Sequence, residues 1–182
     1  KEREFFQPEI LQQALALAEQ INDQARQVAK LHTQETNLLN LKNSLLPWAP
    51  LDLPLELQET ITSVIQLGTC PPAVDLSKLE EELAQAAERA QIMEVSQDKH
   101  QRYLLLVCHK EEIDGAIQCL RSHGYSAARL KGMTGTPAEN IRQTEQEIAK
   151  VQRERDEIIA QIAACADRRK SLEICQDRIE QD

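Results

Sequence analysis

LLPWAPLDLPLE, at residues 45–56, marks the point where a long uninterrupted stretch of the chain ends. It holds the only tryptophan and three of the seven prolines, whereas residues 9–46 contain neither proline nor glycine. A residue before a proline is pushed out of helical geometry, so the preceding helix is expected to stop at the first of these prolines. The segment therefore predicts a stiff, non-helical elbow in which the tryptophan ring is buried. The elbow residues are Pro47, Trp48, Pro50 and Pro54.

On both sides of the central region, apolar residues recur alternately four and three positions apart. A spacing that averages 3.5 residues is typical of coiled-coil helices. Because a lone amphipathic helix is marginally stable in water, each arm needs a partner, and we expect the two arms to pair as an antiparallel hairpin. The alternative is that each arm joins a separate oligomeric bundle. The expected seam contains Leu17, Ile21, Val28, Leu31 and Leu38 from the first arm, and Ile148, Val151, Ile158, Ile162 and Leu172 from the second.

Polar residues also occupy seam positions. They are expected to restrict the register of the hairpin at some cost in stability. These residues are Gln24, Glu35, Arg155 and Arg169.

The second arm has a clear start signal. Thr136 is followed by Pro137 and, three residues on, by Glu139, which is the pattern of a capping box with proline at the first helical position. The side chain of Thr136 is expected to accept from the amide of Glu139, and the side chain of Glu139 to reach back.

The region between the arms alternates between strand and helix patterns in the order β-α-β-β-α-β, which is the ferredoxin-like arrangement. The sequence thus predicts an α+β fold in which a two-helix hairpin carries this lobe at its tip. Two helices would cover one face of the sheet and leave the other face open to water, a partner or an arm. The expected domains are residues 1–46, 47–136 and 137–182. The expected strands are residues 60–68, 92–96, 102–109 and 125–130, and the expected helices are residues 74–91 and 110–124.

Composition narrows the class of protein. The net formal charge is −9 and the pI is near 5.0, which disfavours nucleic acid, because its phosphates are bound mainly by lysine and arginine. The five cysteines form no CxxC pair, so reduced thiols in the cytoplasm fit best. No apolar run approaches the ~20 residues that span a bilayer, so a soluble segment is expected. The chain does not begin with methionine, and we expect that it was cut from a longer protein or processed.

No catalytic arrangement emerges from the residue types that carry chemistry. His32 and Glu35 offer only two possible metal ligands. Cys108 and His109 are adjacent on an expected strand, so their side chains point to opposite faces. Residues 132–135 read GxxG but lack the rest of a phosphate-binding loop, and the capping box accounts for them. We therefore expect no enzyme activity, no cofactor and no metal site.

Three motifs taken in order resemble one family. They are the elbow LLPWAPLDLPLE, the strand and turn SVIQLGTCP, and the sequence GMTGTPAENI that opens a long heptad helix. Together they resemble the cytoplasmic N-terminal domain of V-type ATPase/ATP synthase subunit I, called the a subunit in eukaryotes. The resemblance covers nearly the whole chain and corresponds to the far lobe and the helical arms of that domain.

The resemblance implies a non-catalytic stator part at the cytoplasmic face of a membrane complex that couples ion or proton transport to ATP hydrolysis or synthesis. Its implied partners are the peripheral stalk, a heterodimer of subunits E and G, together with the rest of subunit I and the membrane rotor sector. Family residues that handle ions lie in a membrane domain to which nothing here corresponds. We expect the lobe to meet a stalk through the turns QDKHQ and KGMTGTP, with Lys99, His100, Arg102 and Lys131 as contacts.

Two other functions stay open on the sequence. A lobe of this order also occurs in small-molecule regulatory modules of the ACT type, which predicts paired lobes and a ligand-dependent rise in melting temperature. A coiled-coil arm of a nucleic-acid machine predicts salt-sensitive binding to DNA or RNA, which the acidic charge disfavours.

Overall fold

The computed structural model describes residues 2–130 and 132–181. The chain divides into two compact units, one formed by residues up to Asn40 together with those from Gln146 onward, the other by Leu41–Glu145. The elements in order are α1 (Glu2–Leu45), a 3-10 turn (Leu46–Trp48), β1 (Ser63–Cys70), α2 (Leu76–Ala86), β2 (Ala90–Gln97), β3 (Arg102–His109), a second 3-10 turn (Lys110–Glu112), α3 (Ile113–Arg121), β4 (Ser126–Ala127) and α4 (Pro137–Gln181).

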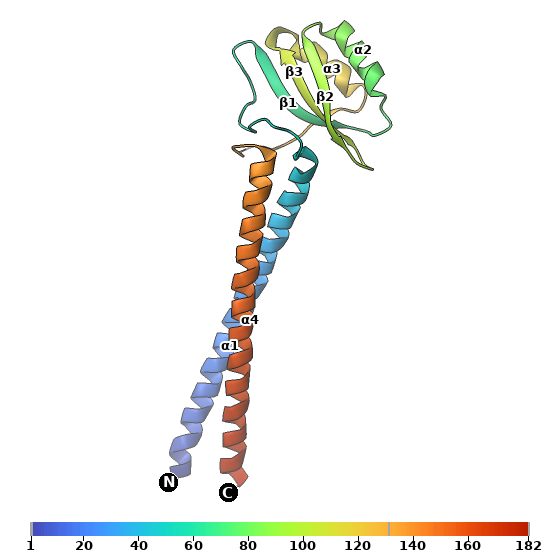
Figure 1. Ribbon diagram of the computed structural model, residues 1–182. Coiled ribbons are helices and arrows are strands. Elements are labelled where there is room, and N and C mark those ends of the chain that lie inside the picture. The colour runs from blue at the N-terminus through green and yellow to red at the C-terminus, as the bar shows by residue number, and fades with distance from the viewer. Residues whose placement is uncertain (1, 131, 182) are drawn as a thin grey trace. The chain divides into compact units, whose positions relative to one another are not determined.

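The helical unit consists of the greater part of α1 and of α4, which run antiparallel (Figure 1). Gln24 of α1 donates a hydrogen bond to Gln161 of α4 over 3.1 Å, and Glu35 forms an ion pair with Arg155. Residue numbers rise along one helix as they fall along the other, as an antiparallel hairpin requires. The ten apolar residues expected in the seam are all buried or half-buried: Leu17, Ile21, Val28, Leu31, Leu38, Ile148, Val151, Ile158, Ile162 and Leu172.

The second unit is the lobe, a four-stranded antiparallel sheet in the order β2-β3-β1-β4. This is the strand order of the ferredoxin-like arrangement, so the expected α+β fold is confirmed. Helices α2 and α3 cover one face of the sheet (Figure 1). Because side chains alternate along a strand, the even-numbered residues of β3 point into this layer. The core contains Leu79, Leu83, Leu104, Leu106, Ala116 and Leu120.

Several expected boundaries were wrong. The helix predicted over residues 74–91 ends at Ala86, because Ala87 is extended (φ −149°, ψ 104°) and the chain joins the sheet at Ala90. The last strand, predicted over residues 125–130, is limited to Ser126–Ala127. The first strand was expected to stop at Gly68, but β1 continues to Cys70.

Two further expectations about the region after α1 were also wrong. The elbow is not wholly non-helical, because Pro47 sits in the first turn of a 3-10 helix, where its fixed φ fits and its missing N–H costs nothing. The sheet face away from the helices is only partly open. The chain after the elbow covers part of it, and Leu51 and Leu55 are buried there.

Candidate docking site

The elbow is anchored in the lobe by its tryptophan. The Trp48 ring is 2 % exposed and meets the Tyr103 ring edge-on, with 5.3 Å between ring centroids and 82° between planes. Ser96 donates a hydrogen bond to the carbonyl of Pro47. Both contacts attach the elbow to strands β2 and β3 and fix its first turn against the sheet. Pro50 and Pro54 continue the chain toward the sheet face.

The same tyrosine reaches the β2–β3 turn. Its hydroxyl donates to Asp98 over 2.8 Å, and Asp98 also accepts from the amides of His100 and Gln101. These hydrogen bonds, chiefly the one from Tyr103, hold the pKa of the Asp98 carboxyl below its usual range. Burial raises the pKa of the Tyr103 phenol, which keeps it a hydrogen-bond donor. The turn is thus held in one conformation by the residue that supports the elbow.

The four basic residues expected to meet a partner do not form one surface. Lys99 and His100 are exposed side by side in the β2–β3 turn. The guanidinium of Arg102, whose side chain is 19 % exposed, is instead bound to Glu94 over 3.1 Å and donates to the carbonyl of Pro72. Lys131 lies outside the described residues. The turn therefore offers two free basic side chains, and Arg102 has a local role.

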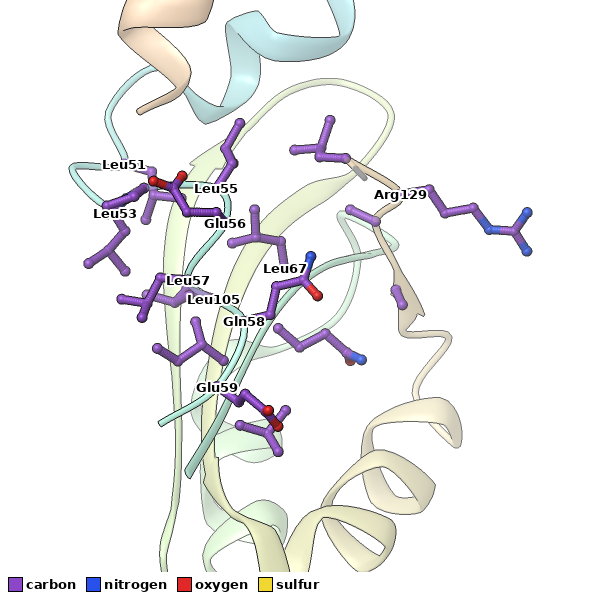
Figure 2. A pocket seen from close by; sticks show the side chains of 17 residues that line it. Leu51, Leu53, Leu55, Glu56, Leu57, Gln58, Glu59, Leu67, Leu105 and Arg129 are labelled. Carbon is purple, nitrogen blue, oxygen red and sulfur yellow. The ribbon is translucent and has the colours of Figure 1, made fainter. Parts of the chain in front are cut away.

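A groove that sequence reasoning missed lies on the sheet face opposite the helices. It has a volume of about 830 Å³, and its walls are residues 51–59 on one side and residues 127–130 on the other. Figure 2 shows Leu67 and Leu105 on its floor, while the guanidinium of Arg129 points away from it. Most of the lining is aliphatic, so the groove is suited to accept apolar side chains rather than to perform chemistry.

A sequence signal for this groove exists. In LDLPLEL, at residues 51–57, leucine occupies every second position, which in an extended chain places all four on one side. The segment is not fully extended, because the amide of Leu57 donates to the carbonyl of Pro54 over 3.1 Å, yet Leu51 and Leu55 are buried, while Leu57 stays 38 % exposed. The prolines in the same stretch predicted an elbow, and the alternating leucines were not interpreted.

The loop before α4 is closed by the protein's own groups. Thr136 accepts from the amide of Glu139 and Glu139 accepts from the amide of Thr136, each over 3.2 Å. The amide of Gly135 donates to the Glu56 carboxylate over 2.8 Å, and its carbonyl accepts from the amide of Leu55 over 2.8 Å. The amides of Gly135 and Thr136 are therefore already engaged, and they do not point at an open anion site.

Two histidines and two cysteines of the lobe have structural roles. His109 accepts from the amide of Glu111 over 3.1 Å, and His123 contacts the carboxylate of Glu82. Cys70 and Cys108 are buried, which raises the pKa of both thiols. Within residues 2–130 and 132–181, no three of the histidine, cysteine and acidic side chains are grouped so as to bind a metal ion. Across the same ranges, no helix has an apolar stretch that would let it cross a bilayer.

Similarity to known proteins is found at the level of the structure. No family model matches the chain, and no curated protein matches it. Among solved structures, the chain is similar to the crystal structure of the cytoplasmic N-terminal domain of subunit I, a homolog of subunit a, of V-ATPase, with a TM-score of 0.58 and 16 % sequence identity. The match covers 94 % of this chain and 58 % of that one. Nearly the whole length of this chain thus has the fold of that domain. The chain spans little more than half of the length of the solved domain.

Proposed function

We propose that this chain is a non-catalytic stator part of a rotary V-type ATPase or ATP synthase. The observation that carries the proposal is the shared fold across 94 % of the chain, because the match includes the long helical pair as well as the lobe. A fold shared by one lobe alone supports many functions, whereas long paired helices joined to a ferredoxin-like lobe are a rarer combination.

In this role the chain links the membrane ion-translocating sector to a peripheral stalk on the cytoplasmic side. The proposed stalk partner is the heterodimer of subunits E and G. The arrangement of the lobe supports a mechanical role, because its exposed turn and the loop before α4 are held by hydrogen bonds, and His109 and His123 already have structural partners. The lobe surface that we propose for the contact is the β2–β3 turn with Lys99 and His100.

Binding to the stalk tests the proposal. The chain is immobilised, and the purified E/G heterodimer of the same organism is passed over it in a biolayer interferometry experiment at physiological salt. We expect saturable binding in the micromolar range, typical of a small polar interface. The absence of binding at about 100 µM heterodimer would overturn the stator role.

Variants separate the role from the surface. Lys99→Glu combined with His100→Glu is expected to weaken binding about tenfold, because one rim charge is reversed and a second negative charge is added beside it. Lys78→Glu is the matched control, since Lys78 is an exposed lysine on α2, away from the turn. Tight binding that neither substitution changes would keep the stator role and reject the turn as its contact. Arg102 is left unchanged, because its loss would free Glu94 and disturb the lobe itself.

A further inference from the structure

The helical pair presents two different long sides to solvent. One side carries a groove of about 560 Å³ lined by Gln13, Ala16 and Gln20 of α1 and by Arg168 and Ser171 of α4, among others. Each of these residues comes one position before a residue at the seam spacing of its own helix, namely Ala14, Leu17 and Ile21 of α1 and Arg169 and Leu172 of α4. Residues one position before the seam therefore lie on the same side in both helices, and residues one position after the seam lie on the opposite side.

The opposite side is mostly apolar between residues 11 and 29 of α1 and between residues 159 and 166 of α4, and the charged residues Asp156 and Lys170 of α4 lie at its ends. We call it the outer apolar side and define it by Leu11, Leu15, Ala25 and Ala29 of α1 with Ile159 and Ala163 of α4. All six residues are exposed, and the side chains of Leu11, Leu15 and Ile159 are 51 %, 57 % and 46 % exposed. The Gln24–Gln161 and Glu35–Arg155 contacts bracket Ala29 on one helix and Ile159 on the other, so the two rows lie at the same level of the pair.

The spacing on this side indicates what covers it. From residue 11 to residue 39, the α1 row recurs alternately every four and three positions, as the seam does, and none of its members is charged. An uncharged row with a period of 3.5 is suited to packing against another helix. The row reads Leu11, Leu15, Ala18, Asn22, Ala25, Ala29, His32, Thr36 and Leu39.

A second copy of this chain supplies the complementary helix. Leu11 and Leu15 are four residues apart at one end of the row, and Ala25 and Ala29 are four residues apart at the other. A two-fold axis perpendicular to α1 and midway between these pairs places Leu11 of one copy against Ala29 of the other, and Leu15 against Ala25. Large side chains then meet small ones at both ends of the contact, and Ala18 meets Asn22 near the axis, so the contact is self-complementary.

We propose that the chain self-associates through the outer apolar side to form an antiparallel pair of helical hairpins. From residue 11 to residue 29 the contact is about 27 Å long, and two adjacent helices are about 20 Å wide. Each copy thus covers roughly 500 Å², or about 1,000 Å² for the pair, which is at the lower end of specific interfaces. The dimer is accordingly weak, with a Kd in the range of about 10–100 µM. The inference does not depend on the stator role.

Sedimentation velocity between about 1 and 300 µM chain tests the dimer. Ala25→Glu places a charge in the proposed contact, and Ala16→Glu places the same charge on an exposed alanine of the same helix on the groove side. We expect Ala25→Glu to raise the Kd about tenfold or more, and Ala16→Glu to leave it within about twofold. Helicity by far-UV circular dichroism should be equal in both variants, which excludes unfolding as the cause.

A cross-link tests the register. Leu15→Cys combined with Ala25→Cys is expected to give an intermolecular disulfide between positions 15 and 25, located by peptide mass spectrometry under mild oxidation. A wild-type chain that stays monomeric at about 300 µM overturns the proposal. So does a dimer that Ala16→Glu weakens as much as Ala25→Glu, or one in which the two introduced cysteines fail to join.

Discussion

Replacing Gly68 by alanine is expected to destabilise the lobe, although alanine usually stabilises a strand. A Cβ atom on Gly68 would lie 2.2 Å from Cε2 and Cζ of Tyr125, whereas carbon atoms in good contact are about 3.5 Å apart. The Tyr125 ring is 4 % exposed and its hydroxyl donates to Gln66 over 2.8 Å, so it has no free space to move into. Overpacking of this kind costs roughly 1–3 kcal/mol, and the entropy gain of losing a glycine offsets about 0.5–1 kcal/mol of it.

Urea unfolding followed by Trp48 fluorescence measures this cost in the lobe alone, since Trp48 is the only tryptophan and is buried there. Gly115→Ala is the matched control, because its Cβ would lie 3.5 Å from the Ala86 carbonyl, an ordinary contact, and the change should stabilise α3 by about 0.5 kcal/mol.

On a Tyr125→Ala background the cost of Gly68→Ala should disappear, which gives a coupling of about 1–3 kcal/mol. A Gly68→Ala lobe as stable as the wild type, or a coupling below about 0.5 kcal/mol, would refute the packing argument.

Trp48→Ala is expected to cost the lobe about 3–5 kcal/mol, measured by scanning calorimetry, because it removes a buried ring and its edge-on contact. In the helical unit, Glu35→Leu leaves the Arg155 charge without its main partner and should cost about 2 kcal/mol, whereas the double replacement with Arg155→Leu should recover most of it in urea melts read at 222 nm. Burial raises the pKa of Tyr125 above its ordinary 10.0, so the stability that depends on the neutral phenol is complete below pH 10.0 and is lost as the pH rises beyond it. The urea midpoint should therefore fall above that pH, and less steeply in Tyr125→Phe. Thr136→Ala removes the helix cap of α4 and is expected to lower the free energy of unfolding by about 1 kcal/mol, which is measured as a fall in the melting temperature.

Where local pattern and tertiary environment agree, the sequence predicts the fold well. RYLLLVCH was predicted as a strand over residues 102–109, and β3 has those bounds because it is central, apolar and paired on both sides. The helix after Val74 was extended too far because residues 87–91 favour helix on composition, while their pairing with β3 determines the outcome. Gly68 was taken as the end of a strand. Its actual role is to let the Tyr125 ring lie against β1, and that contact is invisible without the fold.

The candidate docking surface was less predictable than the fold. The exposure of Lys99 and His100 follows from a polar turn between two strands, which a sequence shows directly. The commitment of Arg102 to Glu94 depends on the alignment of β2 with β3, including an irregularity between Glu94 and Ser96, and register of this kind is not written in either strand alone.

The ends of the two long helices are joined inside the lobe in a way that suits a stator. Within this unit, Lys42 pairs with Glu145 over 3.2 Å, and Leu45, Leu55 and Ile141 form one buried cluster. The paired hydrogen bonds of Gly135, to Glu56 and from Leu55, close the same joint. The segments that enter and leave the lobe are thus tied to each other before either reaches the sheet. A force applied to one helix end is therefore transmitted to the other through the packed cluster and several polar contacts. These contacts bear the force before the hydrogen bonds between β1 and β3 do.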